Sequence, residues 1–345
     1  MGGIRIGAGA PVTVQSMTKT DTRDVEATVR QLHSLAEAGC EIARCAIPDA
    51  AAAEAFAEIK RRSPLPLVAD IHFDYRLALA ALAAGADKLR INPGNIGGRE
   101  RVREVARAAK ERGVPIRVGV NAGSLERDLL ARYGAPCAEA LVESAKRNAA
   151  LLEDEGFGDI VVSIKASDVA TTVQAYEAIS RETDYPLHVG LTEAGSPRSG
   201  TIKSAVAIGA LLLEGIGDTI RVSLTAEPEE EVRVARDILS SVGVRRFGVE
   251  VVSCPTCGRC HGDLLRMVRE VEARVAAIDA PLRVAVMGCE VNGPGEAREA
   301  DVGVALGEGA GLLFSHGKPV ARVPHDEIVS RLVEEIFKLT QRERD

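Results

Sequence analysis

Leu67-Val-Ala-Asp-Ile71 and Lys88-Leu-Arg-Ile91 are two short β-rich runs that flank an alanine-rich amphipathic segment ending at Gly85. A strand, a helix and a second strand in this order form the repeating unit of a parallel sheet. Six more such runs precede residue 245, at 12–17, 41–46, 116–120, 160–165, 187–191 and 219–224. Eight units predict an α/β fold with a (β/α)8 TIM barrel, and an open doubly wound sheet is the structural alternative.

The segments between these runs carry helix start and stop signals. Residues 24–38 repeat apolar side chains at helical spacing and stop at Gly39, which suits a left-handed C-terminal cap. Asp49 is a candidate N-cap for the next helix, and the acidic residues at 227–230 suit the first turn of another. Strand and helix therefore alternate through residues 1–245.

The pattern changes after residue 245. Strands are predicted at 247–252, 283–287, 301–306, 311–314 and 319–323, with one helix at 264–277 and another after Asp326. This order is typical of a compact α+β domain. We therefore expect two domains, a barrel over 1–245 and a smaller domain over 246–345.

Composition limits the class of protein. The chain has 345 residues, of which 46% are hydrophobic and 27% charged, as in ordinary globular proteins. A net charge of -7 and 3% aromatic residues argue against a nucleic-acid partner. No apolar run approaches the ~20 residues of a membrane span, and no signal peptide is evident. We expect a cytoplasmic protein with no membrane partner.

The seven cysteines do not suggest a disulfide framework, because their number is odd and several lie at ligand spacing. Cys40, Cys45 and Cys137 are interpreted as buried apolar residues. The other four lie in Ser253-Cys-Pro-Thr-Cys-Gly-Arg-Cys260 and in Met287-Gly-Cys-Glu-Val-Asn-Gly-Pro-Gly-Glu296. Two cysteines spaced C-x-x-C, joined by a third from a glycine-rich loop, predict a metal or cluster site.

The spacing alone leaves the identity of the fourth ligand open. A structural zinc site would add one more thiolate or His261 to Cys254, Cys257 and Cys289. An iron-sulfur cluster could use Cys260, because Cys254, Cys257 and Cys260 repeat the opening of a ferredoxin run. Glu296 is the third candidate, an oxygen donor that a substrate oxygen could displace. Residues 257–261 also match a haem attachment pattern, but nothing in the chain indicates export.

Polar side chains recur at the carboxyl ends of the predicted strands. Residues two apart share a face of a strand, and in a barrel these ends line the mouth. The resulting set is Arg44; Arg90 with Asn92; Arg117 with Asn121; Ser163 with Lys165; and Arg221 with Ser223. Five converging cations repel one another unless an anion neutralises them, and arginine suits phosphate oxygens. We infer a small substrate with more than one phosphate charge.

Three titratable groups at the predicted mouth are available for proton transfer. Asp70 and His72 lie two apart at one strand end, and Glu193 follows another. Structural alternatives exist for each: His72 as a hydrogen-bonded support for Asp70, and Glu193 as a counter-ion of the arginines.

Long motifs, in order along nearly the whole chain, resemble those of the 4-hydroxy-3-methylbut-2-en-1-yl diphosphate synthases of the methylerythritol phosphate route to isoprenoids. Besides the two cysteine segments, they are Val14-Gln-Ser-Met-Thr18, Ala69-Asp-Ile-His-Phe73, Leu89-Arg-Ile-Asn-Pro-Gly-Asn95, Arg117-Val-Gly-Val-Asn-Ala-Gly-Ser-Leu125, Ser163-Ile-Lys-Ala-Ser167 and Gly190-Leu-Thr-Glu-Ala194. Cys260 departs from the family pattern, and the segment before Pro11 is short for it.

The resemblance implies an oxidoreductase that opens and dehydrates 2-C-methyl-D-erythritol 2,4-cyclodiphosphate, with two electrons delivered through a [4Fe-4S] cluster. By motif position the cluster ligands are Cys254, Cys257, Cys289 and Glu296. The residues that would hold the substrate are Arg44, Arg90, Asn92, Arg117, Asn121, Lys165, Arg221 and Ser223, with Glu193 as proton donor. The resemblance also implies ferredoxin or flavodoxin as electron donor, and a homodimer in which the cluster of one subunit covers the barrel of the other.

Two rival interpretations keep the fold but change the function. In one, the cluster senses iron or oxygen and the barrel has no turnover. In the other, zinc stabilises a lyase-type barrel, which metal content distinguishes from an iron-sulfur enzyme.

Overall fold

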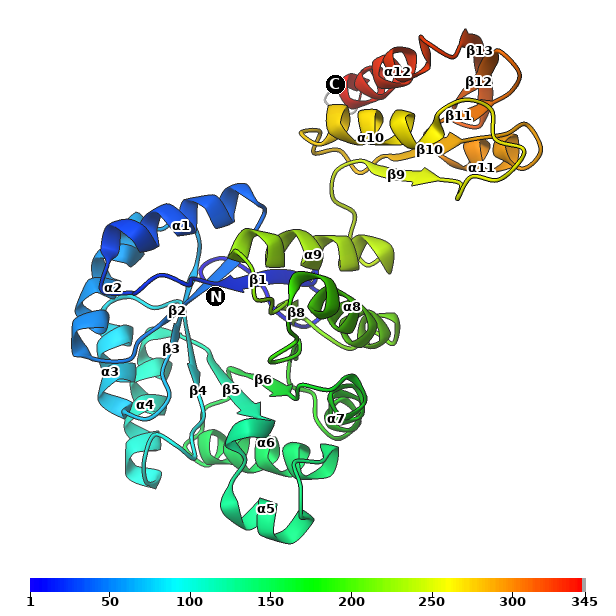
Figure 1. Ribbon diagram of the computed structural model, residues 1–345. Helices are drawn as coiled ribbons and strands as arrows, with labels where there is room; N and C mark the ends of the chain where they lie inside the picture. Colours follow the sequence, from blue (N-terminus) through cyan, green and yellow to red (C-terminus); the bar gives the residue numbers. More distant parts are fainter. Residues whose placement is uncertain (343–345) are drawn as a thin grey trace. The chain divides into compact units, whose positions relative to one another are not determined.

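The computed structural model describes residues 1–342, and the chain divides between Arg245 and Arg246 into two compact units (Figure 1). The predicted end of the second domain, Asp345, lies outside the described residues. Among those residues, no helix has both the length and the apolar character needed to span a membrane.

The first unit is an eight-stranded parallel barrel, which confirms the predicted fold. The sheet order is β6-β5-β4-β3-β2-β1-β8-β7, and a single parallel bridge between Val162 and Leu187 joins its two ends. The strands are β1 (Thr13–Met17), β2 (Ile42–Ala46), β3 (Leu67–Asp70), β4 (Lys88–Ile91), β5 (Ile116–Asn121), β6 (Ile160–Lys165), β7 (His188–Val189) and β8 (Thr219–Ile220).

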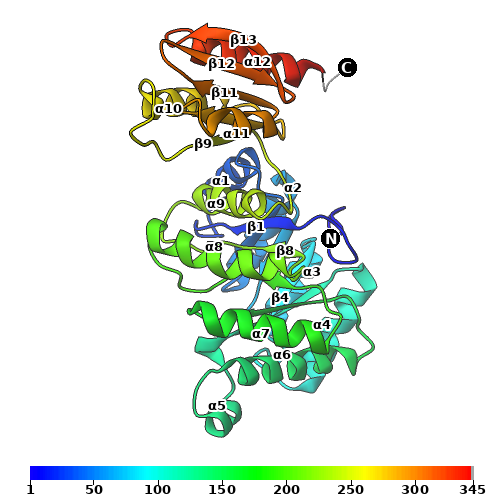
Figure 2. The same cartoon turned by 90° about the vertical axis from the view of Figure 1, so that its right-hand side faces the viewer.

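Helices surround this barrel (Figures 1 and 2). They are α1 (Val25–Glu37), α2 (Ala50–Arg62), α3 (Tyr75–Ala83), α4 (Arg99–Arg112), α5 (Arg127–Tyr133), α6 (Ala138–Glu153), α7 (Val169–Glu182), α8 (Pro197–Leu213) and α9 (Pro228–Ser241), with a 3-10 turn at Ala122–Ser124. Asp49 caps α2 as predicted, because its carboxylate accepts a hydrogen bond from the Ala52 amide. Gly39 and Gly85 have positive φ angles just after α1 and α3, as a helix stop requires.

Strand register places the predicted site residues on the inner face of the barrel. Asp70 pairs with Arg90, Arg90 pairs with Arg117, and Asn121 pairs with Lys165. Paired residues in a parallel sheet share a face, so these side chains point inward together. The alternate residues, such as Leu89, point outward and are fully buried beneath the helices. A TIM barrel interior is usually filled by Val, Ile and Leu, so this one is unusually polar.

Strands β7 and β8 are shorter than the predicted runs at 187–191 and 219–224. The Arg221 amide still donates to the Val189 carbonyl at 2.9 Å, but the Leu224 amide donates to the Glu231 carboxylate at 3.0 Å. The Glu231 side chain of α9 thus accepts the hydrogen bond that a longer neighbouring strand would otherwise accept from the Leu224 amide. The prediction was wrong in length because alternating apolar residues do not reveal which amides a distant carboxylate will bind.

The second unit is a five-stranded mixed sheet of order β13-β12-β11-β10-β9. Its strands are β9 (Glu250–Ser253), β10 (Arg283–Met287), β11 (Val302–Leu306), β12 (Ala310–Ser315) and β13 (Lys318–Pro324), and its helices are α10 (Leu264–Val275), α11 (Gly293–Glu299) and α12 (Ile328–Arg342). Helices α10 and α12 share one apolar core with the sheet, and α11 packs into a second around Phe314. Helix α11 was not predicted, since its sequence, Gly-Pro-Gly-Glu-Ala-Arg-Glu, is typical of a turn.

Candidate functional site

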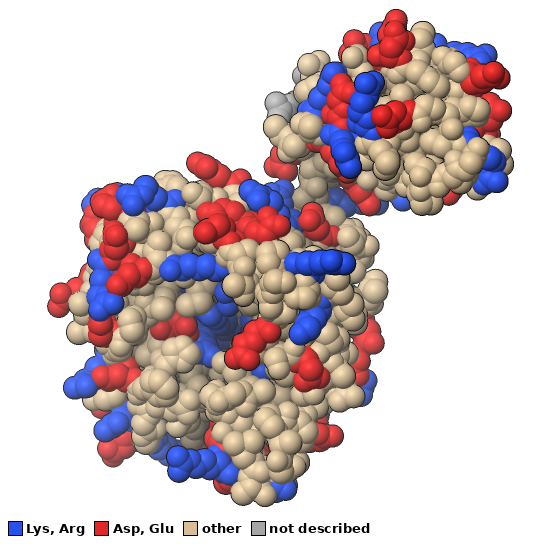
Figure 3. All heavy atoms as spheres, viewed as in Figure 1, with Lys and Arg blue, Asp and Glu red and all other residues tan. Residues whose placement is uncertain are grey.

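A cavity of about 100 Å³ opens at the carboxyl ends of the barrel strands. Figure 3 shows it as a hollow in the barrel with Lys and Arg atoms at its bottom. Its lining residues are Arg44, Asp70, His72, Arg90, Arg117, Asn121, Ser163, Lys165, Leu191, Thr192, Arg221 and Ser223. The structure therefore brings together ten of the residues that the sequence placed at strand ends, from six different strands or the segments that follow them.

Three of the five cations of this cavity are deeply buried, and Arg44 and Arg221 are partly buried. Arg117 is 1% exposed, and Arg90 and Lys165 are each 6% exposed. Burial lowers the pKa of Lys165, and the charges of Arg221 and Arg117 lower it further. Burial and Arg44 likewise lower the pKa of Arg221 to about 10. Each cation thus destabilises its neighbours, and a bound anion would relieve this repulsion.

Asp70 is the carboxylate among the residues that line this cavity. Its oxygens lie 3.2 Å from Arg90 Nη1, 3.3 Å from His72 Nε2 and 3.8 Å from Arg44 Nε. Burial raises the pKa of Asp70, but Arg44, the hydrogen bond from His72 and Arg90 together outweigh it and lower the pKa. The ionised form is therefore favoured, which suits a counter-ion better than a proton donor.

Glu231 is a second buried acid that the sequence did not reveal. It is 2% exposed, and its carboxylate lies 3.4 Å from Arg221 Nη2 and 3.2 Å from Lys19 Nζ. In the sequence it is the third glutamate after Pro228, and the acidic run was interpreted only as a favourable helix start. Glu231 lies three residues after Pro228, which is also buried, so the two side chains share one face of α9. This helical spacing is the signal in the sequence that could have predicted the burial of Glu231.

Two glycines make room for the cations. A Cβ atom at Gly119 would lie 2.5 Å from Arg90 Nε, and one at Gly190 would lie 2.3 Å from the Arg221 carbonyl oxygen and 3.1 Å from Lys165 Nζ. Gly119 stands between Arg117 and Asn121 on the inner face of β5. These glycines are therefore part of the site, although neither donates a polar side chain.

Two of the predicted site residues do not line the cavity. Asn92 is buried, and its side-chain oxygen accepts a hydrogen bond from the Gly94 amide at 3.1 Å, so it holds the loop after β4. Glu193 is exposed and has a φ angle of +54°, which is uncommon for a residue with a side chain. Such strain is often found where a side chain is held in place for function.

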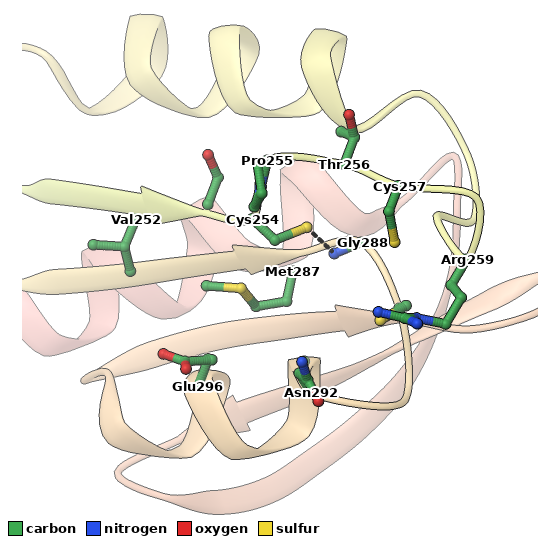
Figure 4. A pocket seen from close by; sticks show the side chains of 13 residues that line it. Val252, Cys254, Pro255, Thr256, Cys257, Arg259, Met287, Gly288, Asn292 and Glu296 are labelled. Carbon is green, nitrogen blue, oxygen red and sulfur yellow. Dashed lines mark hydrogen bonds between the residues drawn. The ribbon is translucent and has the colours of Figure 1, made fainter.

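A separate cavity of about 420 Å³ in the second unit is lined by Cys254, Cys257, Cys289 and Glu296. Figure 4 shows Cys254, Cys257 and Glu296 approaching it from three segments: the end of β9, the following turn and α11. Gly288 borders it, and its amide lies 3.3 Å from the Cys254 sulfur. Among residues 1–342, no three His, Cys, Asp or Glu side chains are arranged to hold a single metal ion. The four donors instead surround a space.

Cys289 lies in the loop before α11, four residues ahead of its first residue, Gly293. Backbone hydrogen bonds from Asn292 and Val291, with a smaller one from Gly293, lower the pKa of its thiol, and the Arg259 side chain adds to them. Arg259 and Asn292 also line the cavity. The thiolate is the form of cysteine that binds metals, so this environment suits a ligand.

Cys260 and His261 are not among the residues that line this cavity. The Cys260 side chain packs against the core formed by α10, α12 and the sheet, and burial raises the pKa of its thiol. The His261 amide donates to the Gly288 carbonyl at 2.8 Å, which fastens the cysteine turn to the loop after β10. The lining therefore fits a cluster on three thiolates and one carboxylate.

The remaining cysteines are structural. All seven are free thiols, and Cys40 and Cys45 are buried in the barrel, where burial raises their pKa to about 12 and about 11. Cys137, predicted to be buried, is only half-buried. It occupies the N-cap position of α6, where the chain turns at the surface before entering the helix.

Comparison with known proteins places both units in one family. Residues 1–236 match the model of the GcpE TIM-barrel domain, and residues 250–338 match that of the GcpE protein C-terminal domain. The chain is 59% identical to the 4-hydroxy-3-methylbut-2-en-1-yl diphosphate synthase (flavodoxin) of Geobacillus kaustophilus, over 99% of the chain and 91% of that protein. It is 58% identical to the enzyme of the same name from Geobacter sulfurreducens, over 98% and 96%.

Likeness to solved structures extends to the fold alone. N-acetylneuraminic acid synthetase from Leptospira borgpetersenii superposes with a TM-score of 0.50 over 80% of the chain and 96% of that protein. The two sequences are 12% identical, so the match concerns the fold and not the chemistry.

Proposed function

The chain belongs to the GcpE family, and from this premise we propose that it is a 4-hydroxy-3-methylbut-2-en-1-yl diphosphate synthase. The reaction is the reductive opening and dehydration of 2-C-methyl-D-erythritol 2,4-cyclodiphosphate. The observation that carries this proposal is the mouth of the barrel, where five buried or partly buried cations surround a cavity bordered by one carboxylate. A small cyclic diphosphate supplies the charge that this arrangement lacks.

The barrel residues bind and orient the diphosphate. Arg44, Arg90, Arg117, Lys165 and Arg221 pair with its phosphate oxygens, and Asn121 and Ser223 donate hydrogen bonds beside them. Asn92 contributes through the loop that it holds. When the Asn121 amide is oriented with its oxygen toward Arg90, this oxygen accepts a hydrogen bond from Arg90 Nη2 at 3.1 Å. Asn121 therefore also fixes the position of the Arg90 guanidinium group. Binding in a buried, cationic cavity also excludes water from the reacting ring.

In the second unit, a [4Fe-4S] cluster would be held by Cys254, Cys257, Cys289 and Glu296. When bound, the cluster supplies electrons one at a time and acts as a Lewis acid. The chain's contribution is to keep the ligands in their binding forms: the amides at the start of α11 favour the Cys289 thiolate. The carboxylate of Glu296 gives one position a weaker, exchangeable donor than a thiolate.

Proton delivery during dehydration is assigned to Glu193. Its positive φ angle and its exposure in the loop after β7 support this role, because among residues 1–342 the side chain makes no hydrogen bond or ion pair that would hold it away from the mouth. His72, which is 54% exposed beside Asp70, is the second acid-base group. Asp70 serves the reaction as the ionised partner of His72 and Arg90.

The enzyme acts as a homodimer, in which the cluster unit of one subunit covers the barrel of the other. Helix α8 offers a surface for this assembly. Ile202, Val206 and Leu213 lie within about 40° on one face of the helix, by helical geometry, and are 59%, 54% and 71% exposed. An apolar, self-complementary face of this kind suits a two-fold dimer.

Flavodoxin is the electron donor named for the relatives, and a flavodoxin or ferredoxin fills this role for the chain. Seven free thiols are consistent with a reducing cytoplasm.

An anaerobic assay tests the function directly. Purified protein with its cluster restored, reduced flavodoxin and the cyclodiphosphate should give the allylic diphosphate, followed by phosphorus NMR. Arg117→Ala should lose activity, whereas Arg61→Ala, at an exposed helix position, should retain it. Failure of the wild-type protein, with cluster and reductant verified, contradicts the proposal.

A further inference from the structure

A second cavity, of about 390 Å³, lies at the amino end of the barrel strands. Its walls are the N-terminal residues 4–8, Pro115 before β5 and residues 158–161 at the start of β6. Figure 2 shows the N-terminus at the opposite end of the barrel from α5, which follows the carboxyl end of β5. This floor cavity is therefore separate from the substrate cavity at the mouth.

Lys88 reaches the floor cavity from inside the barrel. It is the first residue of β4 and shares the inner face with Arg90, yet it is 1% exposed. Among residues 1–342, its amine has no hydrogen bond and no ion pair, although it lines the cavity. Burial, with a smaller effect of Arg117, lowers the pKa of Lys88 to about 7. A substantial fraction of the amine is therefore uncharged, and nucleophilic, at neutral pH.

The surroundings of this amine favour a negative charge. Arg117 Nε and Nη1 are buried without a hydrogen-bond acceptor, and His188 Nε2 is in the same condition. Asp159, the acid that lines the floor cavity, is exposed at its rim. Protonating Lys88 adds one more cation to a group that already repels itself. A modification that leaves a carboxylate on the nitrogen would instead place a negative charge within electrostatic range of Arg117 and His188.

We propose that Lys88 is a site of carbamate formation, entered from the floor cavity by carbon dioxide. The neutral amine nitrogen forms a bond to the carbon of carbon dioxide, and one carbon-oxygen π bond breaks as its electron pair moves to oxygen. The nitrogen then loses one proton to solvent. The product is a lysine carbamate, and no oxidant or reductant is needed.

Carbon dioxide suits this site better than an aldehyde. An imine formed with an aldehyde carries no negative charge, so it would leave the Arg117 donors without an acceptor. The proposal does not depend on the reaction at the mouth, because Lys88 is not among the residues that line the substrate cavity.

The test is covalent trapping on the intact protein. Wild type, Lys88→Arg and Lys110→Arg are incubated with isotopically labelled bicarbonate at mildly alkaline pH, alkylated with a trialkyloxonium salt and mapped by peptide mass spectrometry. Lys110 is an exposed lysine that donates to the Gly156 carbonyl, so its substitution is the matched control. We expect a labelled carboxyl group on Lys88 in wild type and in Lys110→Arg, and its complete loss in Lys88→Arg.

Two outcomes overturn the proposal. One is an unmodified Lys88 in wild type at saturating bicarbonate. The other is a bicarbonate-dependent rise in melting temperature without any covalent label, which would make the floor cavity a non-covalent anion site. Because mapping locates the label within the wild-type chain, the test stands even if Lys88→Arg does not fold.

Discussion

Arg90 Nη1 lies 3.2 Å from Asp70 Oδ1, and both side chains are buried at the mouth of the barrel. The same carboxylate lies within 4 Å of Arg44 and His72. One acid therefore organises the cationic site before any substrate is present.

Replacing Asp70 with Asn should destabilise the protein and create a dependence on added anions. Breaking a buried ion pair by removing one partner costs about 3–5 kcal/mol, because the other charge is left uncompensated. Chemical denaturation should show this loss, and inorganic diphosphate should restore stability more in Asp70→Asn than in wild type. Glu58→Gln, which breaks an exposed pair with Arg61, is the control and should change little. Equal stability of Asp70→Asn and wild type would remove Asp70 from this role.

Gly119→Ala should impair the site without removing a polar group. The added methyl group would stand 2.5 Å from Arg90 Nε, so the guanidinium must move by a substantial fraction of an ångström. A shift of that size near the reacting groups costs about a hundredfold in kcat/KM. Gly158→Ala is the control, since a Cβ atom there meets nothing within 4 Å. If steady-state kinetics show the two variants to be equally active, Arg90 does not need its present position.

Substrate binding should be coupled to proton uptake. In the free protein, burial and then Arg221 and Arg117 lower the pKa of Lys165, so its charged form is less stable than in solvent. An anionic ligand favours the charged form and raises this pKa, so the complex binds more protons than the free protein. Affinity should therefore fall as the pH rises. Calorimetry in buffers of different ionisation enthalpy measures the uptake, and Lys165→Met should reduce it; proton release on binding would contradict the assignment.

Val206→Glu should convert the dimer into monomers. The substitution places a charge at the centre of the exposed apolar face of α8, where two copies would bury it. Light scattering after size-exclusion chromatography gives the mass directly. Val244→Glu changes an exposed valine just beyond α9 and should leave the dimer intact. A dimeric Val206→Glu protein would show that the interface lies elsewhere.

The sequence was sufficient to predict the barrel and most of its mouth, because both follow from local periodicity. Alternation with a period of two puts Arg90 and Arg117 on one face, and eight repeats of strand and helix define the barrel. The glycines at 119 and 190 were missed as site residues. Their role depends on how close two strands and a guanidinium come, which no single segment reveals.

Long-range contacts account for the other omissions. Glu231 reaches the mouth from a helix that follows the last strand, and its partner Lys19 follows the first, more than two hundred residues earlier. Helix α11 was missed because Gly-Pro-Gly has low helix propensity and is held instead by packing of Ala297 against the sheet. The sequence predicts Lys88 only as part of a strand, because burial without a partner is a property of the folded barrel.

Iron, acid-labile sulfide and zinc per chain, measured on protein purified without oxygen, test the central claim most directly. Wild type should hold about four iron and four sulfide, with a spectrum that changes when the cyclodiphosphate is added. Cys260→Ser should keep this content and Cys257→Ser should lose it, because Cys257 lines the cavity and Cys260 does not. Stoichiometric zinc without colour, or loss of iron from Cys260→Ser alone, would contradict a catalytic cluster held by three cysteines and Glu296.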